Sequence, residues 1–238
     1  MKKKQKLLLL LILIMVSVFT IYKMFNNNKM IYIALGDSVA EGRNPYGEIN
    51  YGYTDFIADD LKSKNKLDRY TKKYTKSGYK TSDVITQLKE YRDIKRDLRE
   101  SDLVTISIGA NDFLARINKD NLNIDEISNY KYIVSDIMPN IDLCLKEVRK
   151  YAKSKLIIVG YYNPIPFLFN TNEKDLDLLF SYVDDEYQKL AKKYHAIYIS
   201  NYQLFKKNSD FLPNPLDIHP NIEGYQAIAK AVLKKLNY

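Results

Sequence analysis

The chain has 238 residues, and 46% of them are hydrophobic, which is enough to bury one sizeable core and predicts a single domain. Five of the 37 basic residues and none of the 29 acidic ones precede residue 28, so residues 29–238 hold 32 basic against 29 acidic groups, a net charge of +3 that argues against a nucleic-acid-binding protein. The single cysteine, Cys144, excludes an internal disulfide and is predicted to be a buried structural thiol, and two histidines in total argue against a histidine-rich metal site.

The first 28 residues have the pattern of a targeting segment. Met1–Lys6 carries four lysines, and Leu7–Tyr22 is a run of sixteen residues without a charge. As a helix this run would be about 24 Å long, short of a hydrocarbon core of about 30 Å unless lysines snorkel and Met24 and Phe25 extend it. It is slightly longer than a usual signal-peptide core, and no small-x-small cleavage site follows it. We therefore expect an uncleaved signal anchor with the amino terminus inside; a cleaved signal peptide is the alternative.

Beyond this segment, apolar strand-like runs alternate with helical patterns. The predicted strands are Met30–Leu35, Arg69–Thr75, Leu103–Ile108, Lys155–Tyr161 and Ala196–Ser200. The predicted helices are Tyr53–Lys64, Ser82–Leu98, Glu126–Lys153, Lys174–Tyr194 and Asn221–Leu236. Pro139 either kinks the third helix or begins a second helix within it. The alternation predicts an α/β domain over residues 29–238, a three-layer α/β/α sandwich on a five-stranded parallel sheet.

Three short motifs carry candidate chemistry. They are Gly36-Asp37-Ser38 at the end of the first strand, Gly109-Ala110-Asn111-Asp112 at the end of the third, and Asp217-Ile218-His219 before the last helix. Because the carboxyl ends of parallel strands meet at one edge of a sheet, Ser38, Asn111 and His219 can converge there as a nucleophile, an amide donor and an imidazole base. Ordinary turn and helix-cap chemistry is the alternative explanation of each motif taken alone.

With these motifs the chain resembles the SGNH, or GDSL, family of serine esterases and lipases, from about Met30 to the end. Ser38 matches the nucleophile of that family, Gly78 the glycine of its second block, Asn111 its oxyanion-hole asparagine and His219 its general base. The resemblance implies a flavodoxin-like SGNH hydrolase fold, an acyl-Ser38 intermediate, an oxyanion hole of Ser38, Gly78 and Asn111, and no cofactor or metal. Gly78 has a physical rationale as well, because a residue without Cβ lets its amide approach a substrate closely.

The third member of the expected triad departs from the family pattern. The family block reads Asp-x-x-His, whereas Leu216 stands three residues before His219 and the acid Asp217 only two before it. Alternate residues of an extended loop project to the same side, so we expect Asp217 to reach the His219 ring, orient it and stabilise the imidazolium. The alternative is that Asp217 faces solvent and a backbone carbonyl orients His219.

These features predict an extracytoplasmic carboxylic-ester hydrolase that acts on a small-molecule or lipid ester. An O-acetyl esterase or acyltransferase acting on cell-wall glycan is the second candidate. A non-catalytic, membrane-tethered binding module is the third, and it is disfavoured because it has no need of Ser38, Asn111 and His219 together. We expect a monomer held at the cell membrane by its amino-terminal segment with the catalytic domain outside, or a secreted enzyme if that segment is cleaved.

Two further stretches each leave two explanations open. Lys62–Lys80 holds eight basic residues and one acidic residue, and it faces either an anionic polymer or lipid headgroups, or simply solvent at a helix end and an edge strand. Tyr161–Phe169 is aromatic and proline-punctuated, and it either lines an acyl pocket or packs under the following helix.

Overall fold

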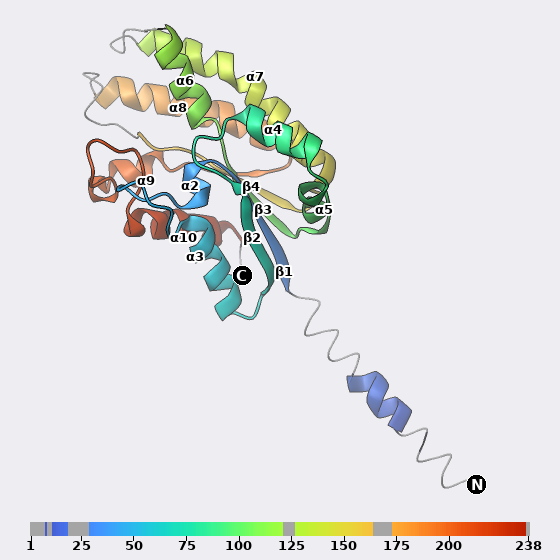
Figure 1. The fold of residues 1–238 in the computed structure, drawn as a ribbon. Coiled ribbons are helices and arrows are strands. Elements are labelled where there is room, and N and C mark those ends of the chain that lie inside the picture. Colours follow the sequence, from blue (N-terminus) through green and yellow to red (C-terminus); the bar gives the residue numbers. More distant parts are fainter. Residues whose placement is uncertain (1–7, 9–10, 19–28, 121–126, 164–172, 237–238) are drawn as a thin grey trace.

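The computed structural model describes residues 8, 11–18, 29–120, 127–163 and 173–236 (Figure 1). Residues 11–18 are helical and exposed, and the other parts of the predicted Leu7–Tyr22 segment, apart from Leu8, lie outside the described residues. Within the described ranges, no helix combines the length and the apolar character needed to cross a membrane.

Five parallel strands form one sheet in the order β2-β1-β3-β4-β5. The strands are β1 (Met30–Gly36), β2 (Leu67–Thr75), β3 (Leu103–Ser107), β4 (Lys155–Val159) and β5 (Ile197–Ile199), so the predicted five-stranded parallel sheet is confirmed. β1, β3 and β4 are almost continuously apolar because both of their faces are covered. The strand order reverses between β1 and β3, so their carboxyl ends form the switch point at which doubly wound sheets bind ligands.

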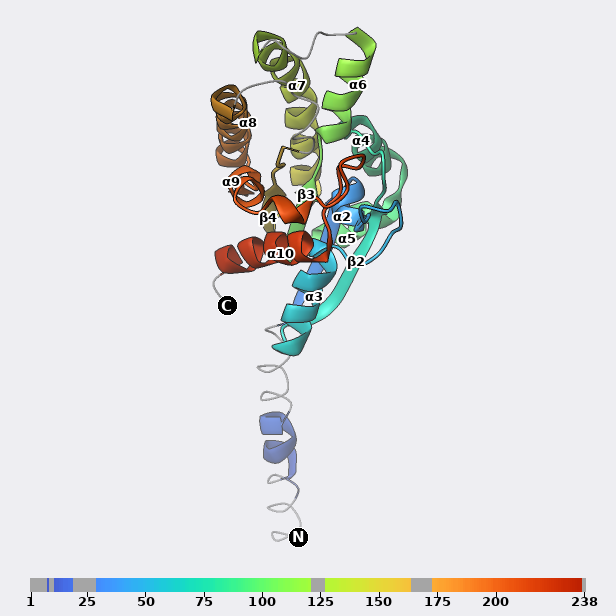
Figure 2. The same ribbon diagram turned by 90° about the vertical axis from the view of Figure 1, so that its left-hand side faces the viewer.

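Helices cover both faces of the sheet, as predicted (Figures 1 and 2). One face packs against α3 (Tyr53–Ser63), α9 (Tyr202–Lys206) and α10 (Ile222–Leu236), and the other against α4 (Thr81–Glu90), α5 (Arg92–Glu100), α7 (Ile127–Tyr151) and α8 (Glu173–Lys193). Alternate residues of each strand supply the two cores. In β1, Ile33 and Leu35 belong to the core on the α7 side, whereas Tyr32 and Ala34 belong to the core on the α10 side.

The predicted helix Ser82–Leu98 is in fact two helices. α4 and α5 are separated by Tyr91, whose backbone is extended with φ −98° and ψ 127°. Leu88 and Ile94 both lie in the core on the α7 side. In one continuous helix these two side chains would point about 120° apart at 3.6 residues per turn, so the break at Tyr91 turns both segments toward the same core.

Helices begin at the two strand ends that carry the motifs, and the sequence patterns do not predict either of them. α2 (Ser38–Glu41) follows β1, and α6 (Ala110–Asp120) follows β3. A short 3₁₀ turn, η1 (Ser209–Phe211), precedes the loop that leads to α10. Pro139 lies inside α7, which continues through it as one helix.

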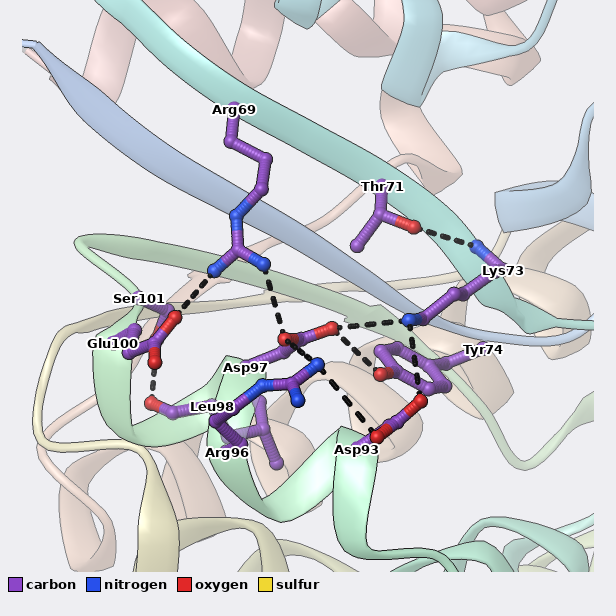
Figure 3. A network of polar contacts seen from close by, with 10 residues as sticks. All are labelled: Arg69, Thr71, Lys73, Tyr74, Asp93, Arg96, Asp97, Leu98, Glu100 and Ser101. Atoms are coloured by element: carbon purple, nitrogen blue, oxygen red, sulfur yellow. Dashed lines mark hydrogen bonds and ion pairs between the residues drawn. The ribbon is translucent and has the colours of Figure 1, made fainter.

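A buried carboxylate joins the edge strand β2 to α5 (Figure 3). The side chain of Asp97 is 2% exposed, and it accepts hydrogen bonds from the Tyr74 hydroxyl at 2.7 Å and from Arg69 Nη1 at 3.1 Å. Lys73 Nζ lies 3.3 Å from the same carboxylate. Burial by itself would raise the pKa of Asp97, but the hydrogen bond from Tyr74 and the charges of Lys73 and Arg69 outweigh it and lower this pKa.

The basic run Lys62–Lys80 is paired in large part with carboxylates of the fold. Arg69 and Lys73 contact Asp97, and two further lysines pair with acids of α3, Lys72 with Asp55 and Lys64 with Asp60. These pairs favour the explanation of the run as a solvated helix end and edge strand over that of a surface for anionic polymers.

We expect Asp97→Ala to lower the free energy of unfolding by about 1–3 kcal/mol, because it leaves the buried Tyr74 hydroxyl without its acceptor. The carboxylate stabilises the fold above its unfolded pKa of about 3.9, and this contribution disappears as the pH falls through the lowered pKa of the folded state. The difference from wild type should therefore be full near neutral pH and shrink below about pH 4. Urea denaturation at several pH values measures it.

The control is Asp93→Ala, which removes an exposed carboxylate that contacts Lys73 and Arg96 at the edge of the same network. It should change the free energy of unfolding by less than about 0.5 kcal/mol. Equal losses in the two variants would show that the buried bond to Tyr74 does not stabilise the fold.

Candidate active site

A close approach of two backbones fixes the turn after β1. Gly36 has φ +129°, and a Cβ at this position would lie 2.0 Å from the Ser107 carbonyl oxygen in β3, so only glycine fits. The same carbonyl accepts a hydrogen bond from the Asp37 N–H at 3.0 Å. The chain then turns into α2, whose first residue, Ser38, is 7% exposed at the carboxyl ends of β1 and β3.

Asp37 caps α2 and is itself buried beside the predicted nucleophile. Its carboxylate accepts hydrogen bonds from the Val39 N–H at 3.1 Å, the Ser107 hydroxyl at 3.3 Å and the Tyr161 hydroxyl at 2.5 Å. Burial raises the pKa of Asp37 to about 6, although these hydrogen bonds favour its charged form. Tyr161 therefore packs against the serine turn, while residues 164–169 of the stretch predicted as an acyl-pocket wall lie outside the described residues.

The structure brings Ser38 and His219 together although they are 181 positions apart in the chain. Ser38 Oγ lies 2.8 Å from His219 Nε2, and His219 Nδ1 lies 2.6 Å from Asp217 Oδ1. When Nδ1–H donates to the carboxylate, Nε2 is left as an acceptor for the serine hydroxyl. The three side chains thus form one chain of hydrogen bonds, with Asp217 rather than a backbone carbonyl at its far end.

The two-residue spacing between Asp217 and His219 works through a turn, not through an extended loop as the sequence argument assumed. Asp217 Oδ1 also accepts a hydrogen bond from the backbone N–H of His219 at 2.8 Å, which closes an Asx turn and directs the carboxylate toward the ring. The Tyr162 hydroxyl donates to the carbonyl of Ile218, between the two, at 2.9 Å. The sequence does not reveal this role of Tyr162, because nothing in the local sequence connects positions 56 residues apart.

His219 is 8% exposed, and its environment acts on its charge in two directions. Burial disfavours the imidazolium and lowers the pKa of His219, while the hydrogen bond and the charge of Asp217 partly restore it. The net pKa lies below the usual value of 6.5. His219 is therefore neutral near pH 7, the state that can accept a proton.

The segment that carries Gly78 lies between α2 and α6. Asn111, in the first turn of α6, donates from Nδ2 to the Tyr79 carbonyl at 2.9 Å, and its amide has a second N–H besides this one. Gly78 has φ +84°, and a Cβ there would meet nothing within 4 Å. Its left-handed backbone, rather than crowding by the protein, is what requires glycine in this structure.

Other groups considered from the sequence lie away from this cluster. Cys144 is fully buried in α7, and burial raises the pKa of its thiol. Among the residues that the structure describes, no three or more His, Cys, Asp or Glu side chains are grouped to hold a metal ion.

The chain is similar in sequence to known proteins. A sequence model of the GDSL-like lipase/acylhydrolase family matches residues 34–227. An uncharacterised protein of Bacillus subtilis (strain 168), YpmR, is 25% identical over 212 residues, which cover 87% of this chain and 81% of that protein.

Solved structures share the fold. A lipase from a goat rumen metagenome, Lip_vut3, superimposes with a TM-score of 0.65 at 20% identity, covering 85% of this chain and 95% of that one. Axe2, an acetylxylan esterase from Geobacillus stearothermophilus, superimposes with a TM-score of 0.63 at 17% identity, covering 88% and 94%. Because the family match includes both strand-end motifs and the His219 loop, the chain belongs to the GDSL-like lipase/acylhydrolase family of carboxylic-ester hydrolases.

Proposed function

We propose that Ser38 attacks the carbonyl carbon of an ester, that His219 accepts the serine proton, and that Asp217 orients His219. The observation that carries the proposal is the pair of contacts from Ser38 Oγ to His219 Nε2, 2.8 Å, and from His219 Nδ1 to Asp217 Oδ1, 2.6 Å. A serine hydroxyl is barely nucleophilic near neutral pH, and a base within about 2.6–3.2 Å has to take its proton as it attacks.

The reaction proceeds in two halves. As the Ser38 oxygen bonds to the carbonyl carbon, its proton moves to His219 Nε2, and the Asp217 carboxylate stabilises the imidazolium that forms. The imidazolium then gives this proton to the leaving alkoxide oxygen, which leaves an acyl ester on Ser38. In the second half a water molecule attacks the acyl carbon as His219 Nε2 takes its proton; the bond to the Ser38 oxygen then breaks, the carboxylic acid leaves, and the proton returns to that oxygen. These steps use only side chains of this chain and water, so we expect no cofactor requirement.

The negative charge on the substrate oxygen needs donors at fixed positions. The candidates are the backbone N–H groups of Ser38 and Gly78 and the side-chain amide of Asn111. Support comes from the position of Asn111 in the first turn of α6 and from its hydrogen bond to the Gly78 segment. Loss of one such donor typically lowers kcat by about 10²–10³-fold.

An O-acetylated glycan is the second candidate substrate, and one neighbour in fold supports it. Axe2, which shares the fold, is an acetylxylan esterase. The same serine and histidine would transfer the acyl group instead of hydrolysing it if a glycan hydroxyl replaced water in the second half of the reaction. A non-catalytic binding module gains no support, because the Ser38, His219 and Asp217 contacts would have no purpose in it.

We also propose that the amino-terminal segment holds the catalytic domain outside the cell membrane. Under this proposal, the place where β1 begins bears on the substrate. β1 has seven residues, which span roughly 20 Å at about 3.3 Å per residue, and Figure 1 shows the chain entering β1 at the end opposite to α2. A tether before Met30 would present Ser38 away from the bilayer, which favours a wall glycan over a lipid of the same membrane.

Ser38→Ala should reduce hydrolysis of short p-nitrophenyl esters by the full-length protein to the background rate, because it removes the hydroxyl that lies 2.8 Å from His219 Nε2. His195→Gln, which changes the histidine outside the site, is the matched control and should retain wild-type turnover. If Ser38→Ala keeps wild-type turnover, Ser38 is not the nucleophile.

The pKa of His219, followed by NMR of its ring proton, should lie below 6.5 because burial disfavours the imidazolium. Direct titration is preferable to a rate profile, since Asp37, with its pKa raised to about 6, titrates in the same range. The neutral ring is the active form, so kcat/KM should fall as the pH drops through this value. A His219 pKa above 6.5 would contradict the burial argument.

Asp217→Asn should lower kcat by about 10³–10⁴-fold, as loss of an orienting carboxylate can. It should also move the His219 pKa further down, since Asp217 is the group that raises it. Turnover and ring titration of the variant test both effects. A loss of less than about tenfold, with His219→Ala inactive, would mean that Ser38 and His219 work as a dyad.

The full-length protein should sediment with membranes and be digested by protease added outside intact cells, because the lysines at its start hold the amino terminus inside. Immunoblots of cell fractions measure both. A shortened protein in the culture medium would show that the segment is cleaved.

A further inference from the structure

A carboxylate on the nucleophile helix binds the segment that carries Gly78. Glu41 is the last residue of α2, three positions after Ser38. Its Oε2 accepts two hydrogen bonds from Ser77, one from the backbone N–H and one from the hydroxyl, each at 2.6 Å. Ser77 immediately precedes Gly78, so these two bonds connect a proposed oxyanion donor to the helix that begins with the nucleophile.

The other end of the segment is held in the same manner. Thr81 donates its N–H at 3.0 Å and its hydroxyl at 2.6 Å to the carboxylate of Asp112. Asp112 follows Asn111, which itself donates to the Tyr79 carbonyl. Each end of the segment 77–81 is therefore bound by a carboxylate from a helix that also carries a residue of the proposed site, Glu41 in the helix of Ser38 and Asp112 in that of Asn111.

Side-chain packing holds only one side of Gly78, where Tyr79 packs against the core on the α7 side. Gly78 itself is exposed, and a Cβ on it would touch nothing. On the other side of Gly78, the two hydrogen bonds between Ser77 and Glu41 connect the segment to α2. Hydrogen bonds to an ionised carboxylate are roughly twice as strong as neutral ones, which suits this purpose.

We propose that Glu41 is a positioning residue that fixes the Gly78 N–H against Ser38 and so sets the geometry of the oxyanion hole. This inference rests on the proposed function. Oxyanion donors act only when they lie about 2.7–3.1 Å from the developing charge, and a displacement of about 1 Å can cost about 10²-fold in rate. Glu41 does not touch the substrate; it acts through Ser77.

The test is steady-state kinetics of full-length variants on a short p-nitrophenyl ester, with thermal unfolding of each variant. Glu41→Ala should lower kcat by about 10- to 100-fold with little change in KM, because the ground state makes less use of the oxyanion hole than the transition state does. Glu41→Gln keeps an acceptor oxygen at the same place and should stay within a few-fold of wild type. Asn111→Ala, expected to lose about 10²–10³-fold, calibrates complete loss of a donor.

The matched control is Asp83→Asn. Asp83 accepts a hydrogen bond from the Lys80 N–H at 2.8 Å, in the same stretch, but it connects that stretch only to its own helix α4. It should alter thermal stability without altering kcat. Ser77→Ala should lower kcat by part of the amount that Glu41→Ala does. The double variant should have the same kcat as Glu41→Ala alone, since both substitutions remove the same link.

The outcomes separate this inference from the proposed function. If the wild type is active and folded Glu41→Ala has the same kcat, the positioning role alone is overturned. The same holds if Glu41→Ala loses kcat and Glu41→Gln loses as much. A loss of the same size in Asp83→Asn would overturn it too, because the effect would then follow general destabilisation. A folded wild type that hydrolyses no ester would overturn the proposed function and this inference with it.

Discussion

The contact of Gly36 with the Ser107 carbonyl is the constraint on which the site depends. β1 and β3 come so close at this point that a side chain cannot fit between them, and the chain leaves the sheet with a backbone that only glycine adopts easily. This turn places Ser38 at the point where the strand order reverses. The other proposed groups come from other parts of the chain, His219 and Asp217 from the loop before α10 and Asn111 from α6, so their placement is useful only because this turn is fixed.

Hydrogen bonds from the segment after β4 support the residues around Ser38. Two consecutive tyrosines follow β4. Tyr161 donates to Asp37, the residue before Ser38, and Tyr162 donates to the carbonyl of Ile218, the residue before His219. The buried charge of Asp37 is unfavourable, as its raised pKa indicates, and three hydrogen bonds offset part of that cost. The site thus resembles other preorganised sites, in which supporting hydrogen bonds hold the reacting groups in place.

The sequence predicted those parts of the fold that local patterns determine. β1, β3 and β4 are recognisable in the sequence because a parallel strand covered on both faces is almost continuously apolar, and Ser38 and Asn111 are recognisable because they follow such strands. The division of α4 from α5 was missed, since it depends on which core Ile94 enters, and this is a property of the packed molecule. α2 was missed because four residues are too few to show a helical period.

The contacts around the site were less predictable, because they join residues far apart in the chain. The spacing of Asp217 and His219 suggested a contact, but the Asx turn that produces it depends on a side-chain hydrogen bond that spacing does not reveal. Glu41 and Ser77 are 36 residues apart, and each is a residue type that is common at helix ends or in turns. Their roles follow only from the three-dimensional arrangement.

The most direct test is to label the proposed nucleophile chemically and to locate the label by mass spectrometry. The full-length protein is treated with a fluorophosphonate, digested, and its labelled peptide is sequenced. We expect one adduct per chain, on the oxygen of Ser38, and no adduct in His219→Ala, because the serine needs its base to react. An adduct on a different residue, or an active ester hydrolase that is never labelled, would contradict this expectation.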